Sequence, residues 1–552
     1  MGTLKSLFYA LALALVFVAG AFTGPWLADL LQADDIRSAA KVMNLEFTSQ
    51  EIDSLLPDLE DNRKSYDALR SQALDNAVSP ALVFNPMPMG YSPPLEQLPR
   101  VFSGAAKTTL PTNRDELAWY SVQQLAELIR TRQISSEELT RFFIERLKKH
   151  DPTLQCVITL TEDLALEQAR RADGEIKAGK YKGPLHGIPY GAKDLLAKKG
   201  YPTTWGAMPY KDQVLDYDAT VVQKLEAAGA VLVAKLTLGA LAWGDVWYGG
   251  TTKNPWDLKT GSSGSSAGSA SAVAAGLLPF AIGTETLGSI VSPSTTCGAT
   301  GLRPTFGRVS RHGAMALAWS MDKIGPICRY VEDCALVFQA IYGPDGKDLA
   351  VVSAPFNFNA QPGPKDLKIG YLKSDFERPY PFRAQDSAAL ATLQSLGFEL
   401  TPIRLPELPD IRIILEAEAA AAFDELTRSN RDDLMVRQIR NAWPNVFRGA
   451  RFIPAVEYLQ ANRKRSELIE AMHREVFSKV DVYVHPSFGS SSLTITNYTG
   501  HPCVVVPNGF QRNGRPTSIS FTSKLYEEGM ALEVALAFQQ ATEHHKKHPA
   551  GF

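Results

Sequence analysis

The feature that most constrains this chain is the segment at 261–289, where an alanine-rich stretch joins two serine clusters that have glycine neighbours. Glycine beside serine lets the backbone adopt positive φ and brings N–H groups close to a bound group, as an oxyanion or phosphate cradle requires. A flexible Gly/Ser linker has a similar composition. A linker is excluded because SASAVAAGLLPFAIG predicts a helix that leads into a buried apolar strand. These serines are therefore expected to belong to a functional site.

Length and charge narrow the class of protein. The 552 residues can hold two or three domains, or one large α/β domain with extensions. The net charge is −2, and lysines and arginines are dispersed along the chain, with no basic patch. RNA and DNA are therefore not expected as direct ligands.

The cysteines and histidines show no metal or disulfide pattern. The five cysteines have neither CxxC spacing nor a disulfide framework, and small core residues are the simpler interpretation: Cys156, Cys297, Cys328, Cys334 and Cys503. His544, His545 and His548 follow an amphipathic helix among lysines, which indicates a solvated helix end. We predict neither a metal nor a cofactor.

The N-terminus predicts export. Lys5 precedes an uncharged run at 6–28 with the apolar core LFYALALALVFVA and an AxA-like site at 19–21. Residues 1–21 are therefore predicted to be a signal peptide or, if uncleaved, an N-terminal membrane anchor, because the run is long enough to span a bilayer. Gly24 and Pro25 would break a helix and favour cleavage. The protein is then periplasmic, extracellular or held at a membrane.

Residues 22–115 are predicted to form a helical extension and a proline-rich linker. Thr48 and Glu51 are spaced as a capping box at the start of a helix. The segment that follows has low periodicity and many prolines, which are Pro80, Pro86, Pro88, Pro93, Pro94 and Pro99. It is expected to run extended and to link or wrap onto a main domain at 116–552.

From there on, helix and strand patterns alternate. Ser135 and Glu138 form a second capping box, and Leu139, Phe143 and Leu147 share one helix face. VVQKLEAAG followed by AVLVAKL, and SAALATLQSLG followed by FELTPI, each predict a helix, a glycine stop and a strand. Further strands are expected at DLKIGYL, DVYVHPS, PCVVVPNG and SISFTSK, and MALEVALAFQQAT predicts a closing helix. The pattern indicates an α/β domain built on a large sheet.

Three segments carry a family resemblance: HGIPYGAKD at 186–194, the serine run at 261–269 and GTETLGS at 283–289. Together with TNYTGHPCVVVPNG, they resemble the signature of the amidase signature enzymes over a span from about Glu116 to the C-terminus. The resemblance implies a large mixed, twisted β-sheet flanked by α-helices, and cleavage of amides by a serine nucleophile. The sequence GTETLGSIV is similar to a branch of peptide amidases and broad amidases.

The same resemblance implies a catalytic triad of Lys193, Ser265 after a cis peptide bond, and the nucleophile Ser289. GSSGSS offers two frames, but only the interval from Ser265 to Ser289 matches the family spacing, whereas counting from Ser262 or Ser263 does not.

The chemistry also follows from the residues. A serine must lose its proton as it attacks, and a lysine can take it only when burial keeps the amine neutral. GIPYGAKDLLA places Lys193 among apolar neighbours, which are Ile188, Pro189, Tyr190, Leu195 and Leu196. Ser265 would relay the proton from Ser289, and Ser266 is expected to hydrogen-bond to the lysine amine.

The turn before the nucleophile is expected to form the oxyanion hole and to contact the substrate. It offers the consecutive backbone N–H groups of Thr286, Leu287, Gly288 and Ser289. The commonest family form is GTDxGGSxR, whereas this chain has Glu285 for the aspartate, Leu287 for the first glycine and Val291 for the arginine. A leucine tolerates positive φ poorly, so the geometry of the turn depends on which of its residues adopts a positive φ.

Alternatives stay open from the sequence. Gly264–Gly268 also fits GxSxG, the nucleophile elbow of α/β-hydrolase esterases with Ser266 as nucleophile, although the preceding DLKTGSS does not resemble a strand. The glutaminase component (the A subunit) of a tRNA-dependent amidotransferase would need a partner protein. A non-catalytic binding protein is a further alternative.

The substrate is expected to be a small-molecule or peptide amide. The resemblance implies that its identity is set by variable segments, here 405–475, which could line a pocket or form ordinary amphipathic helices. The oligomeric state, a homodimer included, is not defined by the sequence.

Overall fold

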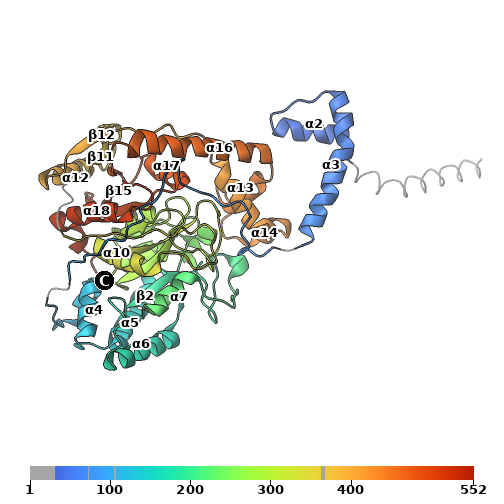
Figure 1. The fold of residues 1–552 in the computed structure, drawn as a ribbon. Helices are drawn as coiled ribbons and strands as arrows, with labels where there is room; N and C mark the ends of the chain where they lie inside the picture. The colour runs from blue at the N-terminus through green and yellow to red at the C-terminus, as the bar shows by residue number, and fades with distance from the viewer. Residues whose placement is uncertain (1–30, 73, 105–106, 362–366) are drawn as a thin grey trace, which may run out of the picture. The chain divides into compact units, whose positions relative to one another are not determined.

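The computed structural model describes residues 31–72, 74–104, 107–361 and 367–552, which form two compact units (Figure 1). One unit holds Met1–Asp75 with Phe452–Ala455, and the other holds Asn76–Arg451 with Val456–Phe552. The signal or anchor predicted at 1–21 lies outside the described residues. Among the residues that are described, no helix combines the length and apolarity needed to cross a membrane.

The smaller unit contains two helices, α2 (Ala33–Val42) and α3 (Ser49–Arg70). The predicted capping box opens α3: the N–H of Glu51 donates to the Thr48 hydroxyl at 3.3 Å, and the N–H of Thr48 donates to Glu51 Oε2 at 2.6 Å. Ile52 is its buried apolar residue. The extension at 22–115 is therefore helical in its described first part.

The proline-rich segment belongs to the larger unit, which begins at Asn76 rather than at the predicted boundary of 116. Asn76 exchanges hydrogen bonds with the backbone of Ala316, and the Tyr91 hydroxyl donates to the carbonyl of Leu525 at 2.6 Å. Val101 pairs with Asn359 in a short bridge. Regular structure is sparse in this segment, but its polar groups bond to distant parts of the chain. Such long-range bonds leave no periodic signal in the sequence.

An eleven-stranded mixed sheet forms the centre of the larger unit, which confirms the predicted architecture. Its strands, in spatial order, are β1 (Val157–Leu160), β3 (Val231–Leu236), β2 (Pro189–Lys193), β8 (Phe280–Glu285), β10 (Lys323–Cys328), β9 (Thr300–Arg303), β14 (Cys503–Phe510), β15 (Pro516–Ser523), β13 (Val482–Pro486), β11 (Ile369–Leu372) and β12 (Leu400–Ile403). Strand β2 is parallel to both β3 and β8, and β11 is parallel to β12 and β13. The remaining pairs are antiparallel.

Helices surround this sheet. In Figure 1, α4, α5 and α6 group at the bottom of the larger unit, and α12, α16 and α17 lie at its top. The second capping box is present at the start of α5, where the N–H of Glu138 donates to the Ser135 hydroxyl at 3.1 Å. The helices are α4 (Val122–Arg130), α5 (Ser136–Leu154), α6 (Glu162–Lys177), α7 (Thr220–Ala227), α8 (Ala267–Ala274), α9 (Val291–Cys297), α10 (Val331–Ile341), α11 (Lys373–Glu377), α12 (Arg383–Ser395), α13 (Ile413–Ala422), α14 (Asp424–Arg428), α15 (Trp443–Ala450), α16 (Ala455–Ala471), α17 (Ser492–Thr499) and α18 (Glu528–Thr542).

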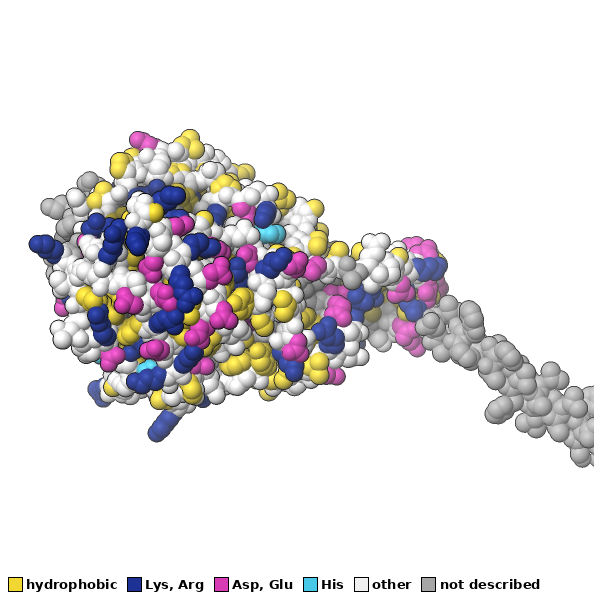
Figure 2. All heavy atoms as spheres, turned by 90° about the horizontal axis from the view of Figure 1, so that it is seen from below, with side chains coloured by type: hydrophobic (Ala, Val, Ile, Leu, Met, Phe, Trp, Pro, Cys, Tyr) yellow, Lys and Arg dark blue, Asp and Glu magenta, His cyan; other side chains and the backbone are white. Residues whose placement is uncertain are grey.

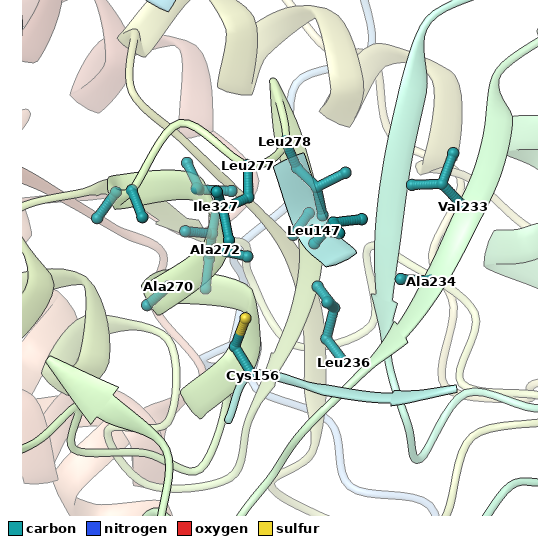
Figure 3. Close-up of a cluster of buried hydrophobic side chains, with 14 of the residues drawn as sticks. Leu147, Cys156, Val233, Ala234, Leu236, Ala270, Ala272, Leu277, Leu278 and Ile327 are labelled. Carbon is teal, nitrogen blue, oxygen red and sulfur yellow. The ribbon is translucent and has the colours of Figure 1, made fainter. Parts of the chain in front are cut away.

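The alanine-rich stretch lies inside the core. Every residue of α8 is buried, and the apolar run that follows becomes β8, as the sequence predicts. Figure 3 shows Ala270 and Ala272 of this helix together with Leu147, Leu278 and Ile327. Small side chains let the helix approach the sheet closely, which a linker could not do. The helix thus holds the loop before it and the strand after it in fixed positions.

One further expectation about composition is met. The five cysteines are buried and free of disulfides. Figure 2 shows positive and negative side chains mixed over the visible face, with no large area of one sign.

Candidate active site

Lys193 is the last residue of β2 and is fully buried. Its Nζ lies 2.7 Å from the Ser265 hydroxyl, 3.1 Å from the Ser266 hydroxyl and 2.9 Å from the Thr284 hydroxyl. The carbonyl of Thr284 is a more distant fourth neighbour at 3.4 Å. The structure therefore joins the lysine segment, the first serine cluster and the end of β8 around one amine.

The amine lies in surroundings that favour its neutral form. Burial lowers the pKa of Lys193 well below its ordinary value, and the nearby Asp322 and Glu285 oppose this shift without contacting the amine. Ser266 donates its proton to the Thr284 carbonyl at 3.0 Å, so it can only accept from Lys193.

Ser265 is the closest group to the amine. Its hydroxyl makes no other hydrogen bond in the described part of the chain and is free to donate into the lone pair of the neutral amine. The free hydroxyl proton of Ser265 therefore lies beside the Lys193 amine. This arrangement can pass a proton from Ser265 to Lys193.

The backbone around Ser265 requires its glycine. The peptide bond between Gly264 and Ser265 is cis, as the resemblance implies. A Cβ on Gly264 would lie 1.8 Å from the carbonyl oxygen of Gly244, so only glycine fits at this close approach. Ser266 then occupies the N-cap position of α8, with its hydroxyl turned to Thr284 and Lys193 and not to the helix.

Ser289 lies in the turn between β8 and α9 and is 7% exposed. Its carbonyl accepts the N–H of Ser266 at 3.1 Å, which ties the two serine clusters together. Its hydroxyl forms no hydrogen bond within the described ranges, in contrast to Ser265 and Ser266. The nucleophile expected from the sequence is therefore tied to the lysine network through its backbone, and its hydroxyl is left free for another partner.

The turn before Ser289 has its positive φ at Gly288, where φ is 84°. Leu287 does not adopt positive φ, and its side chain is partly exposed, so its replacement of the family glycine creates no conflict. The N–H groups of Thr286, Leu287, Gly288 and Ser289 make no hydrogen bond to any residue that the structure describes. They are available to an oxyanion.

Glu285 anchors this turn from inside the protein. Its Oε2 accepts the N–H groups of Ile290 and Val291 at 2.8 and 3.0 Å, and its Oε1 accepts from Arg303 and Asn497, both at 2.8 Å. Burial alone would raise the pKa of Glu285, but the Arg303 guanidinium and the backbone N–H groups lower it to about 2. The carboxylate is therefore ionised and fixes the residues that follow the nucleophile.

The sequence does not reveal the partners of this turn. Arg303 and Asn497 lie far from Glu285 along the chain and meet it only through the sheet and α17. Asp322 accepts a hydrogen bond of 2.6 Å from the Thr286 hydroxyl and is likewise missed. One signal was present in the sequence: Glu285 replaces the family aspartate and Val291 replaces the family arginine. This double replacement suggests that the carboxylate has another guanidinium partner.

A comparison with protein families matches the Amidase model to residues 138–532, which is most of the chain. The chain belongs to the amidase signature family. Among curated relatives, the A subunit of glutamyl-tRNA(Gln) amidotransferase from Moorella thermoacetica is 34% identical over 79% of this chain and 99% of that relative. The protein of the same name from Methylococcus capsulatus is 36% identical over 78% of this chain and 99% of its own length.

Solved structures of this family share the fold. The peptide amidase of Stenotrophomonas maltophilia matches with a TM-score of 0.69 and 28% identity, covering 78% of this chain and 98% of that one. An amidase family protein from Bacillus anthracis matches with a TM-score of 0.71 and 28% identity, covering 79% of this chain and 93% of the other. The shared fold and family make this chain an amide-acting enzyme of the hydrolase and amidotransferase class.

In this amidase signature chain, Ser289 opens into a pocket of about 880 Å³. Trp243 and Leu317 form part of its wall, and α13 and α15 supply Leu415, Trp443 and Val446. The segment at 405–475, which the sequence leaves open as pocket lining or as ordinary helices, therefore lines the site through these two helices.

The structure excludes the nucleophile elbow of an esterase. Ser266 is fully buried, and its hydroxyl is held by Thr284 and Lys193. The strand before it, β7 (Asp257–Gly261), pairs only with β6 (Lys253–Asn254) and lies outside the main sheet. The elbow needs an exposed serine directly after a strand of that sheet.

Proposed function

We propose that this enzyme hydrolyses carboxamides to a carboxylate and ammonia or an amine, through an acyl-enzyme on Ser289. The observation that carries the proposal is the buried Lys193 amine, which bonds to the Ser265 hydroxyl at 2.7 Å beside the Ser289 turn. Burial lowers the pKa of Lys193 well below its ordinary value, which favours the neutral amine that can accept a proton.

The proposed steps conserve protons. When Ser289 Oγ attacks the amide carbon, its proton passes to Ser265, while the Ser265 proton passes to Lys193. The carbonyl electrons move to oxygen, which the free N–H groups of the 286–289 turn stabilise. Lys193 then returns its proton through Ser265 to the departing nitrogen as the C–N bond breaks. Water repeats the sequence on the acyl-enzyme and releases the carboxylate.

The relay requires the Ser289 hydroxyl to turn toward Ser265 once a substrate is bound. Hydrogen bonds of catalytic groups are often long or absent without substrate and form only in the complex. The anchored backbone supports this movement, because the bond from the Ser266 N–H to the Ser289 carbonyl keeps the two serines adjacent.

The test is covalent labelling. A fluorophosphonate should form an adduct on Ser289 of the wild-type protein, located by peptide mass mapping, and Ser289→Ala should give neither the adduct nor hydrolysis of primary amides. EDTA should leave activity unchanged. An adduct on another serine, or activity lost to EDTA and restored by zinc, would contradict the proposal, and a stable fold with neither labelling nor turnover would indicate a binding protein.

A second candidate is the glutaminase component of a tRNA-dependent amidotransferase, which the names of the curated relatives favour. Those matches leave about a fifth of this chain unmatched, since they cover 78–79% of it. The two functions differ in substrate range and partner. Hydrolysis of glutamine alone, dependent on a partner protein, would support the glutaminase, whereas turnover of simple amides by the isolated chain supports the amidase.

We also propose export, either cleaved or membrane-anchored, because Lys5 precedes the apolar run at 6–28. N-terminal sequencing of the native protein decides the mode: a new terminus near Phe22 means a cleaved signal, and an intact terminus in the membrane fraction means an anchor. An intact terminus in a soluble cytosolic fraction would contradict both modes. The mass of the native protein in solution would show whether a homodimer forms.

A further inference from the structure

The pocket that holds Ser289 has apolar walls. Trp243 packs edge-on against Trp443, with ring centroids 4.5 Å apart, and Leu317, Leu415 and Val446 complete the lining on this side. The indole N–H of Trp443 donates to a backbone carbonyl at 2.8 Å, so its ring position is fixed. Such walls favour a substrate with an apolar body.

The pocket lining has more positive than negative side chains, since it holds two arginines and one glutamate. Arg412 lines the pocket but is paired with Glu416 at 3.1 Å. Arg440 also lines the pocket, and neither it nor Arg437 forms an ion pair or side-chain hydrogen bond with any described residue. The segment before α15 therefore presents two guanidinium groups without counter-ions, although the chain as a whole has a net charge of −2.

Arg437 is not itself part of the pocket lining but lies beside Gly244, which is. Its Nη1 is 3.6 Å from the position that a Cβ on Gly244 would occupy. The Gly244 carbonyl in turn touches Gly264, the residue before Ser265. Asp245, which follows Gly244, accepts the backbone N–H of Ser263 at 3.0 Å and forms no ion pair with Arg437. This guanidinium thus remains available at the edge of the active site.

The geometry points to amides that have an apolar body and end in a carboxylate, bound through Arg437 and Arg440. This inference rests on the proposed amidase function and specifies its substrate class. A guanidinium binds a carboxylate through two parallel hydrogen bonds, which makes arginine selective for this group. Two unpaired guanidinium groups beside apolar walls match a substrate with these two features. Arg437 and Arg440 are then specificity-determining residues and take no part in bond cleavage.

The experiment compares amides of equal length that differ only in their far end. Ammonia release is measured for hexanamide, adipamate and 6-aminohexanamide, with butanamide/succinamate and octanamide/suberamate as shorter and longer pairs. We expect kcat/KM for the best carboxylate to exceed that of its neutral partner by about fivefold, the size of a partly exposed ion pair. The ammonium substrate should be the poorest, and added salt should reduce the differences.

Variants identify the groups responsible. The double variant Arg437→Gln/Arg440→Gln should bring the ratio of kcat/KM for the carboxylate to kcat/KM for its neutral partner close to one. Arg512→Gln, an exposed arginine between β14 and β15 that does not line the pocket, is the matched control and should keep the wild-type ratio.

The two proposals fail in different ways. If neutral amides are hydrolysed but no carboxylate is preferred at any length, or if the preference survives in the double variant, the substrate inference is wrong and the amidase proposal stands. If no amide is turned over and Ser289 is not labelled, the amidase proposal is wrong and this inference fails with it.

Discussion

Two lysines lie fully buried on neighbouring strands of the sheet, and their surroundings are opposite in kind. Lys235 on β3 donates to Asp194 Oδ1 at 2.6 Å, and to the Thr203 hydroxyl and the Pro202 carbonyl at 3.1 Å each. Lys193 on β2 contacts hydroxyls and one carbonyl but no carboxylate. The first amine is half of a buried ion pair, and the second is a candidate base.

The comparison shows that burial alone does not decide what a lysine does. A carboxylate in contact compensates for the lost hydration of an ammonium, whereas hydroxyls do so only in part. Lys235 pairs with Ala192 across the two strands and so lies on the opposite face of the sheet from Lys193. Asp194 directly follows Lys193 in the turn after β2, and its side chain reaches Lys235 on that other face. Asp194 therefore does not contact Lys193, and the Lys193 amine can stay neutral.

The largest effect is expected for Lys193→Met, which removes the proposed base and keeps an apolar chain of similar length. kcat/KM for an amide should fall by about 10⁴-fold, the upper range for loss of a general base. Because the pKa of Lys193 is lowered in the folded state, the unfolded chain binds more protons at neutral pH, and the buried amine costs stability there. The melting temperature should therefore be kept or raised. A variant that loses stability along with activity would contradict the assignment.

Lys235→Met should show the reverse pattern. Removing this ammonium leaves the Asp194 carboxylate buried without its counter-ion, which should lower the free energy of unfolding by about 3–5 kcal/mol. Urea denaturation measures the loss, and kcat per folded molecule should change little. The double variant Lys235→Met/Asp194→Asn should recover part of the stability, since the remaining amide needs no counter-ion. Equal stability of Lys235→Met and wild type would show that the ion pair does not hold this region.

Glu285 extends the comparison to a buried acid. Arg303 and the backbone N–H groups overcome the effect of burial and bring the pKa of Glu285 from 4.5 to about 2. A lowered carboxylate pKa stabilises the fold above about pH 4.5, and this contribution, about 3 kcal/mol, is lost as the pH falls toward 2. Urea denaturation from pH 7 to pH 3 should show that decline. Glu285→Gln should have a lower free energy of unfolding at pH 7, and that free energy should change less with pH in this range. A decline identical to that of wild type would contradict the role of Glu285.

Local patterns predict the parts of this site that lie close together in sequence. The lysine segment and the two serine clusters each have their own motif, and the alanine-rich α8 between the clusters could be inferred from composition. The capping boxes at Thr48 and Ser135 placed two helix starts correctly, because a cap depends on residues only three positions apart.

Contacts between distant segments could not be predicted in the same way. Arg303 and Asn497 reach Glu285 through the order of the strands, which no single segment encodes. The Asp194–Lys235 pair depends on two strands being neighbours and on the face to which each side chain points. The boundary at Asn76 has the same cause, since its hydrogen bonds join residues that are far apart along the chain.

The smallest effect concerns the hydroxyls that surround the Lys193 amine, which has no carboxylate in contact. Ser266 donates to the Thr284 carbonyl and so only accepts from Lys193, at 3.1 Å. An acceptor favours the ammonium form, so Ser266→Ala should lower the pKa of Lys193 further. The acid limb of the kcat/KM profile, where the amine becomes protonated, should then move to lower pH by less than about one unit, while the plateau falls by about tenfold because the amine is less firmly oriented. Thr284→Ser keeps its hydroxyl and is the matched control. A shift of the limb to higher pH in Ser266→Ala would mean that this hydroxyl donates to the neutral amine, and would transfer the accepting role to Thr284.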